Sequence, residues 1–371
     1  MKCSVISENF KKALSYVERA TGKDTTIPIL GSFFISTEGS TVKIIGTNLE
    51  IGIQAIVRGT IQESGAVVIP ARPLLAFIAT LSKNEKITLE SRDVDLVVSS
   101  GAEEVVFKGY SQEDFPPFPD VKELYCISAQ KEDMLGVLQR SLIAAARSSV
   151  KPELASVYFL CEREFITIAA TDSFRLAEQK IKPTAISKKL STESFLVPVR
   201  TCEEIIRIFE YGEEKDIKFF IGKGEIKVVY SDIVLYSRLT EGVFPQYQPI
   251  IPKKFTTQMT IKKKEIERNI KRASIFTDKL QGISLQLSPK QSECMMESKN
   301  NLGTYKTSLK TEIQGESLAV VFNYHYLLDG VESFGGENIF FGFSGEASPL
   351  LIRVPKEEHS FYVVMPMRGN T

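Results

Sequence analysis

The chain has 371 residues, with 46 basic and 46 acidic side chains, and its formal net charge is zero. Hydrophobic residues make up 43% and charged residues 25%, an ordinary globular composition with room for two to four domains of about 100–200 residues each. Zero net charge argues against a generally basic nucleic-acid coat but leaves a local basic face open. No apolar run reaches the ~20 residues of a membrane span, and the first residues lack a signal peptide's apolar segment. We therefore expect a cytoplasmic protein without membrane contact.

Residues suited to metal binding or covalent catalysis are scarce. The five cysteines are widely spaced and form no CxxC pair, which favours reduced, buried thiols over disulfides or a zinc site. There are only two histidines, and the sequence lacks GxxxxGK[ST], GxGxxG after a strand, HExxH and GxSxG motifs. We expect no cofactor, no metal ion and no catalytic residues. This pattern favours a binding or scaffolding protein over an enzyme.

The first third of the chain opens with a predicted helix over residues 7–23. Its apolar residues fall at i, i+3, i+4 and i+7, which places them on one helix face. They are Phe10, Ala13, Leu14 and Val17. Strands are predicted in "TVKIIGTN", "KITLES", "VDLVVSS" and "EEVVFKGY", whose apolar residues alternate or run together. Between them, "VVIPARPLLAFI" (67–78) predicts a strand that runs into a second helix.

The same plan recurs twice. The strand-to-helix pattern returns as "FLVPVRTCEEII" (195–206) and "VVFNYHYLLDGV" (320–331), a period of about 125–130 residues. A helix precedes each copy, over 131–147 and over 262–276. The apolar stripes of the later helices are Leu135, Leu138 and Leu142; Ile266, Ile270 and Ala273; and Tyr324, Leu327, Leu328 and Val331. Strands fill the intervals, including a hairpin around "GKG" (222–224).

Two aromatic-proline clusters, over 111–120 and 240–250, predict extended linkers between the copies. Each third therefore contains strands and two helices joined mostly by short turns, which is typical of an α+β fold with antiparallel sheets. We predict three tandem similar domains, over 1–121, 122–251 and 252–371.

The first helix of each third is enriched in positive charge, most strongly over residues 262–279 and least in the middle copy. A single basic helix is most simply a solvated face. Three such helices at equivalent positions predict a positive surface for sequence-independent contact with phosphates.

Several motifs resemble the bacterial DNA sliding clamp family, the beta subunit of DNA polymerase III. They are "TTIPILGSFFIS", "GTNLEIGI", "VIPARPLL", "EDFPPFP", "ATDSFRLAE", "FPQYQPIIP" and the terminal "YVVMPMR". The resemblance covers essentially the whole chain. It implies three clamp domains per chain and two chains closing head to tail into a homodimeric ring that encircles duplex DNA. It also implies a processivity function: the ring tethers the replicative DNA polymerase and binds the clamp loader and repair proteins.

By the same resemblance, the residues expected to face DNA are Lys12, Lys23, Arg72, Arg147, Lys151, Arg200, Arg207, Lys253 and Lys254. Topology would retain the ring on DNA, so weak phosphate contacts without base recognition would permit sliding. The expected dimer interface includes Phe107 and Ile275.

The family's peptide-binding cleft lies between the second and third domains. Carried over by motif, its residues here are Leu154, Thr171, Ser173, Phe174, Arg175, Leu176, Pro245, Ile250, Leu280, Asn323, Tyr326, Val363, Val364, Met365, Pro366, Met367 and Arg368. Family members usually have glycine and a polar ring where this chain has Ser173 and Phe174, and often a basic residue where it has Pro249. These differences predict a more apolar entrance and a changed peptide preference.

Two alternatives remain open. One is an interaction scaffold of the same fold that does not encircle DNA. The other is an enzyme that uses an acidic pair such as Glu203/Glu204 or Glu213/Glu214, although acidic pairs in charged helices are usually solvated.

Overall fold

The computed structural model describes residues 1–22, 27–119, 121–148, 150–187, 192–210 and 213–367. The chain divides into two compact units, each made of several segments. The first contains 1–132, 183–190 and 203–239, and the second contains 133–182, 191–202 and 240–371. Every strand pair in the described residues is antiparallel, as expected for this α+β fold.

The first unit holds two sheets. In the order of strand pairing, the five-stranded sheet consists of β5 (Thr60–Glu63), β1 (Lys2–Ile6), β7 (Lys86–Arg92), β8 (Asp95–Ser100) and β9 (Glu103–Phe107). The nine-stranded sheet consists of β14 (Ala185–Ile186), β10 (Tyr125–Gln130), β16 (Asp216–Ile221), β17 (Glu225–Tyr230), β18 (Ile233–Arg238), β4 (Ile51–Arg58), β3 (Thr41–Thr47), β2 (Ser32–Glu38) and β6 (Gly65–Pro70). The larger sheet joins strands of the first and middle thirds of the sequence.

The second unit has a similar construction. Its nine-stranded sheet is β15 (Thr192–Pro198), β11 (Ser156–Glu162), β12 (Ile166–Thr171), β13 (Arg175–Ile181), β27 (Ser360–Val364), β26 (Leu350–Arg353), β25 (Asn338–Phe343), β19 (Thr257–Lys262) and β23 (Glu312–Gly315). Its four-stranded sheet is β22 (Gly303–Lys310), β21 (Glu293–Asn300), β20 (Gly282–Ser288) and β24 (Leu318–Asn323). Here the larger sheet joins the middle and last thirds.

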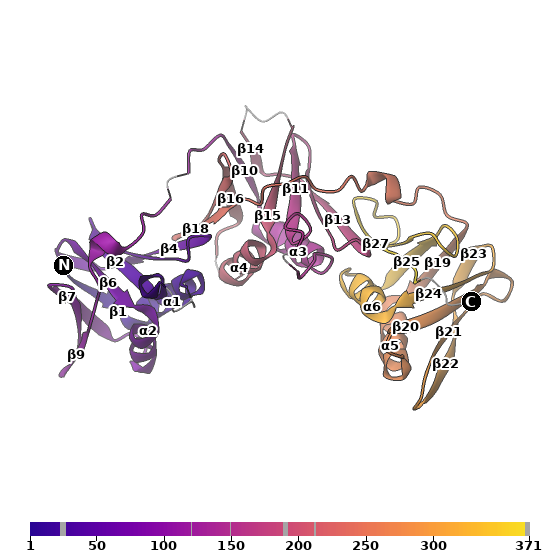
Figure 1. Ribbon diagram of the computed structural model, residues 1–371, viewed down its shortest axis with the longest axis horizontal. Helices are drawn as coiled ribbons and strands as arrows, with labels where there is room; N and C mark the ends of the chain where they lie inside the picture. Colours follow the sequence, from indigo (N-terminus) through magenta and orange to yellow (C-terminus); the bar gives the residue numbers. More distant parts are fainter. Residues whose placement is uncertain (23–26, 120, 149, 188–191, 211–212, 368–371) are drawn as a thin grey trace. The chain divides into compact units, whose positions relative to one another are not determined.

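Six α-helices lie in the described part of the chain, two from each third of the sequence. They are α1 (Ser7–Val17), α2 (Ala71–Thr80), α3 (Lys131–Leu142), α4 (Val199–Phe209), α5 (Lys263–Ala273) and α6 (Tyr324–Glu332). Helices α1 and α2 pack against each other, as do α5 and α6 (Figure 1). Short 3₁₀ helices are η1 (Glu18–Ala20), η2 (Pro28–Gly31), η3 (Gln112–Asp114), η4 (Gln248–Ile250), η5 (Ser274–Phe276) and η6 (Pro289–Gln291).

The repeated strand-to-helix pattern is confirmed. Helices α2, α4 and α6 each begin directly after a strand, at β6, β15 and β24. The first and second copies each contain the same kind of backbone hydrogen bond between segments far apart in sequence. The amide of Tyr110 donates to the carbonyl of Val68 at 2.9 Å, and that of Thr240 donates to Leu196 at 2.9 Å. Each bond ties the segment entering an aromatic-proline linker to the strand before the second helix.

The apolar stripes lie in the cores as expected for the first helices. Phe10, Leu14 and Val17 of α1 are fully buried, and so are Ile266 and Ile270 of α5. This burial, more than intrinsic helix propensity, holds such short helices in place.

The helix predicted over 131–147 ends earlier, at Leu142. The amides of Ala144 and Ala145 bond to carbonyls three residues back, and the amide of Ala146 bonds to Leu154 at 3.0 Å. Because these amides do not donate to the carbonyls four residues back, as an α-helix requires, the α-helix ends at Leu142.

All five cysteines are free thiols, and four of them are buried as expected. Cys126 differs, since it is only half-buried. Burial raises the pKa of the Cys161 and Cys294 thiols from 9.0 to about 12.

Candidate functional site

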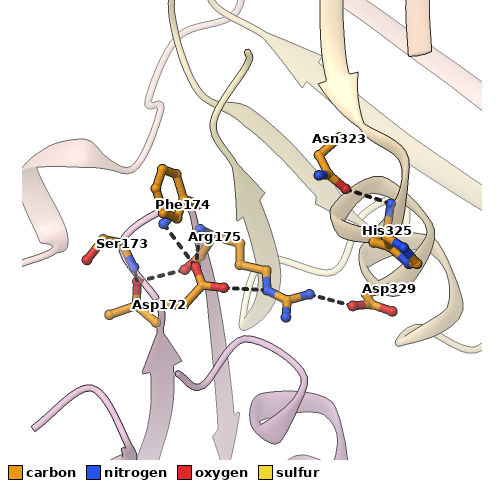
Figure 2. A network of polar contacts seen from close by, with 8 residues as sticks. Asp172, Ser173, Phe174, Arg175, Asn323, His325 and Asp329 are labelled. Carbon is orange, nitrogen blue, oxygen red and sulfur yellow. Dashed lines mark hydrogen bonds and ion pairs between the residues drawn. The ribbon is translucent and has the colours of Figure 1, made fainter. Parts of the chain in front are cut away.

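A network of side-chain hydrogen bonds surrounds the turn between β12 and β13, which contains the "TDSFR" motif. Thr171 Oγ1 accepts from the amide of Ser173 at 3.2 Å and donates to the carbonyl of Arg175 at 2.6 Å. Asp172 Oδ1 accepts from the amides of Phe174 and Arg175, at 2.9 and 3.0 Å (Figure 2). Ser173 has φ +78°, the left-handed region that glycine favours. The side-chain bonds at Thr171 and Asp172 therefore hold a strained turn.

Arg175 links this turn to helix α6. Its Nε bonds to Asp172 Oδ2 at 2.9 Å, and its Nη1 bonds to Asp329 (Figure 2). Its guanidinium lies 4.4 Å from the centre of the Tyr326 ring. Burial lowers the pKa of Arg175, but Tyr362, Asp329 and Asp172 outweigh this effect and raise it above its ordinary value. Arg175 thus stays charged and fixes the turn against the last third of the chain.

Phe174 points outward from the turn. Its side chain is 60% exposed, and its ring is nearly parallel to that of Tyr326, with centroids 6.4 Å apart. Its carbonyl accepts from the amide of Met365 at 2.8 Å, just beyond the end of β27. The amide of Met367 bonds to Val321 at 2.8 Å. We call the surface formed by Phe174, Tyr326, Met365 and Met367 the Phe174 surface.

The residues predicted to bind peptides fall into distinct groups by exposure. Leu154, Thr171, Leu176, Val363 and Val364 are buried; Ser173, Phe174, Pro245, Ile250, Leu280 and Met365 are exposed; Arg175, Asn323, Tyr326, Pro366 and Met367 are intermediate; and Arg368 lies outside the described residues. Leu176 and Val363 belong to one buried cluster. They would form the floor of a binding site and not its rim.

The linker that carries Pro245 and Ile250 is fastened by its aromatic residues. Phe244 and Tyr247 are buried, and the Tyr247 hydroxyl donates to the Glu178 carboxylate at 2.5 Å. Burial and the charge of Glu178 raise the pKa of Tyr247. Pro245 and Ile250 are left facing solvent.

Asn323 and Leu280 have local structural partners. Asn323 caps α6, because its side-chain oxygen accepts from the amide of His325 at 2.9 Å (Figure 2). Leu280 is 59% exposed in a turn whose residue Gln281 accepts from the amide of Tyr324 at 2.9 Å. The capping role of Asn323 was not predicted from the sequence.

The predicted DNA-facing residues that the structure describes are all exposed. Lys12, Arg72 and Arg207 lie on α1, α2 and α4, Arg200 lies in the first turn of α4, and Arg147, Lys151, Lys253 and Lys254 lie in loops. Lys23 lies outside the described residues.

Arg207 bonds to Glu204 at 3.0 Å, and the Glu204 carboxylate also lies 3.6 Å from Arg19. Glu204 is only 7% exposed and so is engaged in an ion-pair cluster. These ion pairs engage Glu204, one member of the Glu203/Glu204 pair considered for catalysis.

The list of DNA-facing residues taken from the family resemblance omitted α5, although the charge pattern over 262–279 predicted a basic helix there. Lys264, Arg268 and Arg272 are exposed at i, i+4 and i+8, on one side of the helix. Lys271 instead bonds to Glu267 at 2.6 Å and to Glu332 at 2.7 Å. The i+4 spacing within 262–279 was the signal that places these three cations on one face, apart from the paired Lys271.

The two smaller sheets each have an edge strand that bears on assembly. Strand β9 is the last of the five-stranded sheet, and β22 is the last of the four-stranded sheet. Phe107 on β9 is half-buried against Phe77, with ring centroids 5.8 Å apart. Ile275, close to β22 in the second unit, is 65% exposed. Open edges of this kind are able to pair with another chain.

The fold is that of the DNA polymerase sliding clamps. A crystal structure of the DNA polymerase sliding clamp from Bacillus subtilis matches with a TM-score of 0.94 at 23% identity, covering 100% of this chain and 99% of that one. A Pseudomonas aeruginosa sliding clamp bound to griselimycin matches with a TM-score of 0.93 at 24% identity, covering 99% of each chain. Curated beta sliding clamps of Synechococcus elongatus and Bacillus subtilis are 25% and 24% identical, over 99% of this chain and 99% and 100% of theirs.

Family models identify the family to which the three parts of the sequence belong. The N-terminal, central and C-terminal domains of the DNA polymerase III beta subunit match residues 1–119, 129–246 and 248–368. The chain therefore belongs to the family of DNA polymerase III beta subunits, the bacterial DNA sliding clamps. The comparisons do not favour the scaffold alternative. No helix in the described residues is long and apolar enough to cross a membrane.

Proposed function

We propose that two copies of this chain close into a ring around duplex DNA and tether the replicative polymerase. The observation that carries the proposal is the match of all three beta-subunit domains, in order, along one chain. The protein would act in DNA replication in the cytoplasm, by binding and without catalysis. The domain boundaries 1–121, 122–251 and 252–371 belong to the same proposal and are supported by the matched ranges.

The repeated strand pairing supports head-to-tail closure. Strand β4 of the first third pairs with β18 of the middle third, and β13 of the middle third pairs with β27 of the last. The equivalent strands β22 and β9 are left open in the described sheets. We infer that β22 of one copy pairs with β9 of the other, which repeats the same junction between chains. Two such heterologous contacts close a ring.

A matched pair of substitutions tests the ring. Ile275→Asp puts a charge on an exposed apolar residue near β22 and should convert dimers into monomers in native mass spectrometry, because burying an unpaired charge costs several kcal/mol. Phe107→Asp should do the same from the other edge. Val94→Asp, on an exposed turn of the same sheet as β9, is the control and should stay dimeric. Dimers that persist in both edge variants would place the interface elsewhere.

The proposed contact with DNA is electrostatic and independent of sequence. The exposed basic residues predicted from the sequence, together with the basic face of α5, would contact phosphates weakly, and topology would provide retention. The protein should stay on a nicked circular plasmid after loading by its clamp loader and leave when the plasmid is linearised. Equal retention on circular and linear DNA would contradict encirclement.

We propose that the Phe174 surface binds linear peptides from the polymerase, the clamp loader and repair proteins. Exposed Phe174 and Met365 would contact the peptide's apolar anchor above buried Leu176 and Val363. Affinities on the order of 1 μM would permit exchange between partners. Met365→Ala should weaken binding of a fluorescent Leu-Phe peptide while dimer mass is unchanged. Unchanged affinity would remove this surface from the proposal.

A further inference from the structure

The first unit contains a second turn built like the turn before Arg175. Between β3 and β4, Thr47 Oγ1 accepts from the amide of Leu49 at 3.0 Å and donates to the carbonyl of Ile51 at 3.0 Å. Asn48 Oδ1 accepts from the amides of Glu50 and Ile51, at 3.1 and 2.9 Å. Each of these bonds has its counterpart in the "TDSFR" turn. The two turns are therefore equivalent in hydrogen bonding, with Leu49 in the place of Ser173.

The equivalence extends to the neighbouring strand. The amide of Arg238, at the end of β18, donates to the carbonyl of Glu50 at 3.1 Å. In the second unit, the amide of Met365, just after β27, donates to the carbonyl of Phe174 at 2.8 Å. Glu50 thus takes the place of Phe174, and Arg238 the place of Met365. The junction of the first two thirds repeats the construction of the Phe174 surface.

A hollow of about 240 Å³ opens at this second junction. Its wall is largely apolar and combines the turn, the first aromatic-proline linker and β18. The residues that matter for its chemistry are Leu49, Pro116, Pro119, Tyr236, Glu50 and Glu225. Ligand sites are usually larger, so this hollow suits one or two anchoring side chains and not a whole small molecule.

Leu49 is an unusual residue for its position. Its φ is +75°, which is uncommon for any residue except glycine and a marked outlier for a bulky one. Its side chain is nevertheless 50% exposed at the hollow. Burial does not explain a strained, exposed leucine. Strained backbone of this kind is concentrated at binding and catalytic sites.

The charges around the hollow indicate the type of ligand. Neither the Glu50 nor the Glu225 carboxylate has an ion-pair or hydrogen-bond partner among the described residues, and Arg238 is the one cation in the lining. We propose that this junction is a second peptide site, which takes a short linear peptide with an apolar anchor next to basic residues. The inference rests on the proposed peptide binding at the Phe174 surface, whose construction it shares.

The test uses the full-length dimer and one probe peptide, in which a photo-reactive leucine and a phenylalanine are flanked by two lysines. A counterpart flanked by two glutamates is the control probe. Cross-links to the wild-type protein should map to residues 47–52 or 116–119 with the lysine probe. Glu50→Lys combined with Glu225→Lys should lower that cross-linking about tenfold and favour the glutamate probe. Leu49→Gly should lower it while thermal stability is kept or raised, since glycine relieves the positive φ.

Met365→Ala separates the two sites. It should leave the cross-links at 47–52 unchanged, whatever it does to those near Phe174. If wild-type cross-links never map to 47–52 or 116–119, or do not respond to the Glu50 and Glu225 reversals, the second site is refuted while the Phe174 surface stands. If the cross-links at 47–52 persist and Met365→Ala changes no peptide binding, the Phe174 surface is refuted and the second site stands by itself.

Discussion

Replacing Arg175 should loosen the turn that carries Phe174. The Arg175 side chain is 12% exposed and bonds to Asp172, which is 14% exposed, and to Asp329, which is 37% exposed. Arg175→Ala leaves the Asp172 carboxylate with two backbone amides and no cation. Breaking a buried pair costs about 3–5 kcal/mol, and the partial exposure of Asp329 reduces this, so we expect a loss of about 2–3 kcal/mol.

The loss of stability should be confined to the turn that carries Phe174 and its contact with β27, so the assay must report on that contact. The amide of Met365 bonds to Phe174, and its hydrogen exchange measures opening of the turn against β27. A loss of about 2–3 kcal/mol corresponds to roughly 30–150-fold faster exchange. Arg353→Ala is a matched control, because Arg353 also lies over an aromatic ring, 4.8 Å from the centre of Phe340, but its side chain bonds to the backbone carbonyl of Glu357.

A double-mutant cycle isolates the contact with α6. Asp329→Asn alone leaves Arg175 paired with Asp172 and should cost about 1 kcal/mol. In the Arg175→Ala background, the same change should cost nothing or stabilise the protein, which gives a coupling energy of about 1 kcal/mol or more. If Arg175→Ala accelerates exchange no more than Arg353→Ala does, or the cycle shows no coupling, the ion pairs do not hold this turn.

Three further predictions concern the turn, the basic face of α5 and a buried thiol. Ser173→Gly should stabilise the protein by about 0.5–1 kcal/mol in urea denaturation, because it removes strain at φ +78°; destabilisation would contradict this. Lys264→Glu with Arg268→Glu should reduce loading on circular DNA several-fold, whereas Lys290→Glu on η6 should not; equal effects would remove α5 from the DNA contact. The raised pKa of Cys294 keeps its thiol protonated in the folded state above pH 9, where the unfolded state loses the proton. Stability should therefore fall by about 1.4 kcal/mol per pH unit between pH 9 and about 12, and Cys294→Ala should reduce that slope in alkaline urea titrations; an unchanged slope would refute it.

Local patterns in the sequence predicted the elements well, because helix stripes and strand alternation depend on neighbouring residues. The three strand-to-helix segments and the core faces of α1 and α5 follow directly from such spacing. The end of α3 at Leu142 does not, since it depends on a bond from Ala146 to Leu154 that periodicity does not encode. For the same reason, the strand order of the sheets was not predicted. The pairing of β4 with β18, for example, is set by contacts between residues far apart in sequence.

The candidate sites show that limit most clearly. The motifs "GTNLEIGI" and "ATDSFRLAE" share few residues, yet their turns form the same side-chain bonds to backbone. Both turns begin with a threonine followed by Asn or Asp, which makes these bonds. The residues that differ, Leu49 and Glu50 against Ser173 and Phe174, are therefore free to set specificity. The family resemblance includes both motifs but implies a binding site at only the second turn; the equivalence of the first turn follows from its hydrogen bonds.

A related turn connects β21 to β22 and keeps the asparagine bonds, with Lys299 in the place of the threonine. Asn300 Oδ1 accepts from the amides of Leu302 and Gly303, at 2.8 and 3.2 Å, as Asn48 and Asp172 do in their turns. Among the described strands of one chain, β22 pairs only with β21, because β22 is an edge of its sheet. In the proposed ring, β9 of the second copy would take the position that β18 and β27 hold at the other two junctions. Ring closure would then use the construction that the chain already uses twice internally, so an interface between copies requires no new kind of contact.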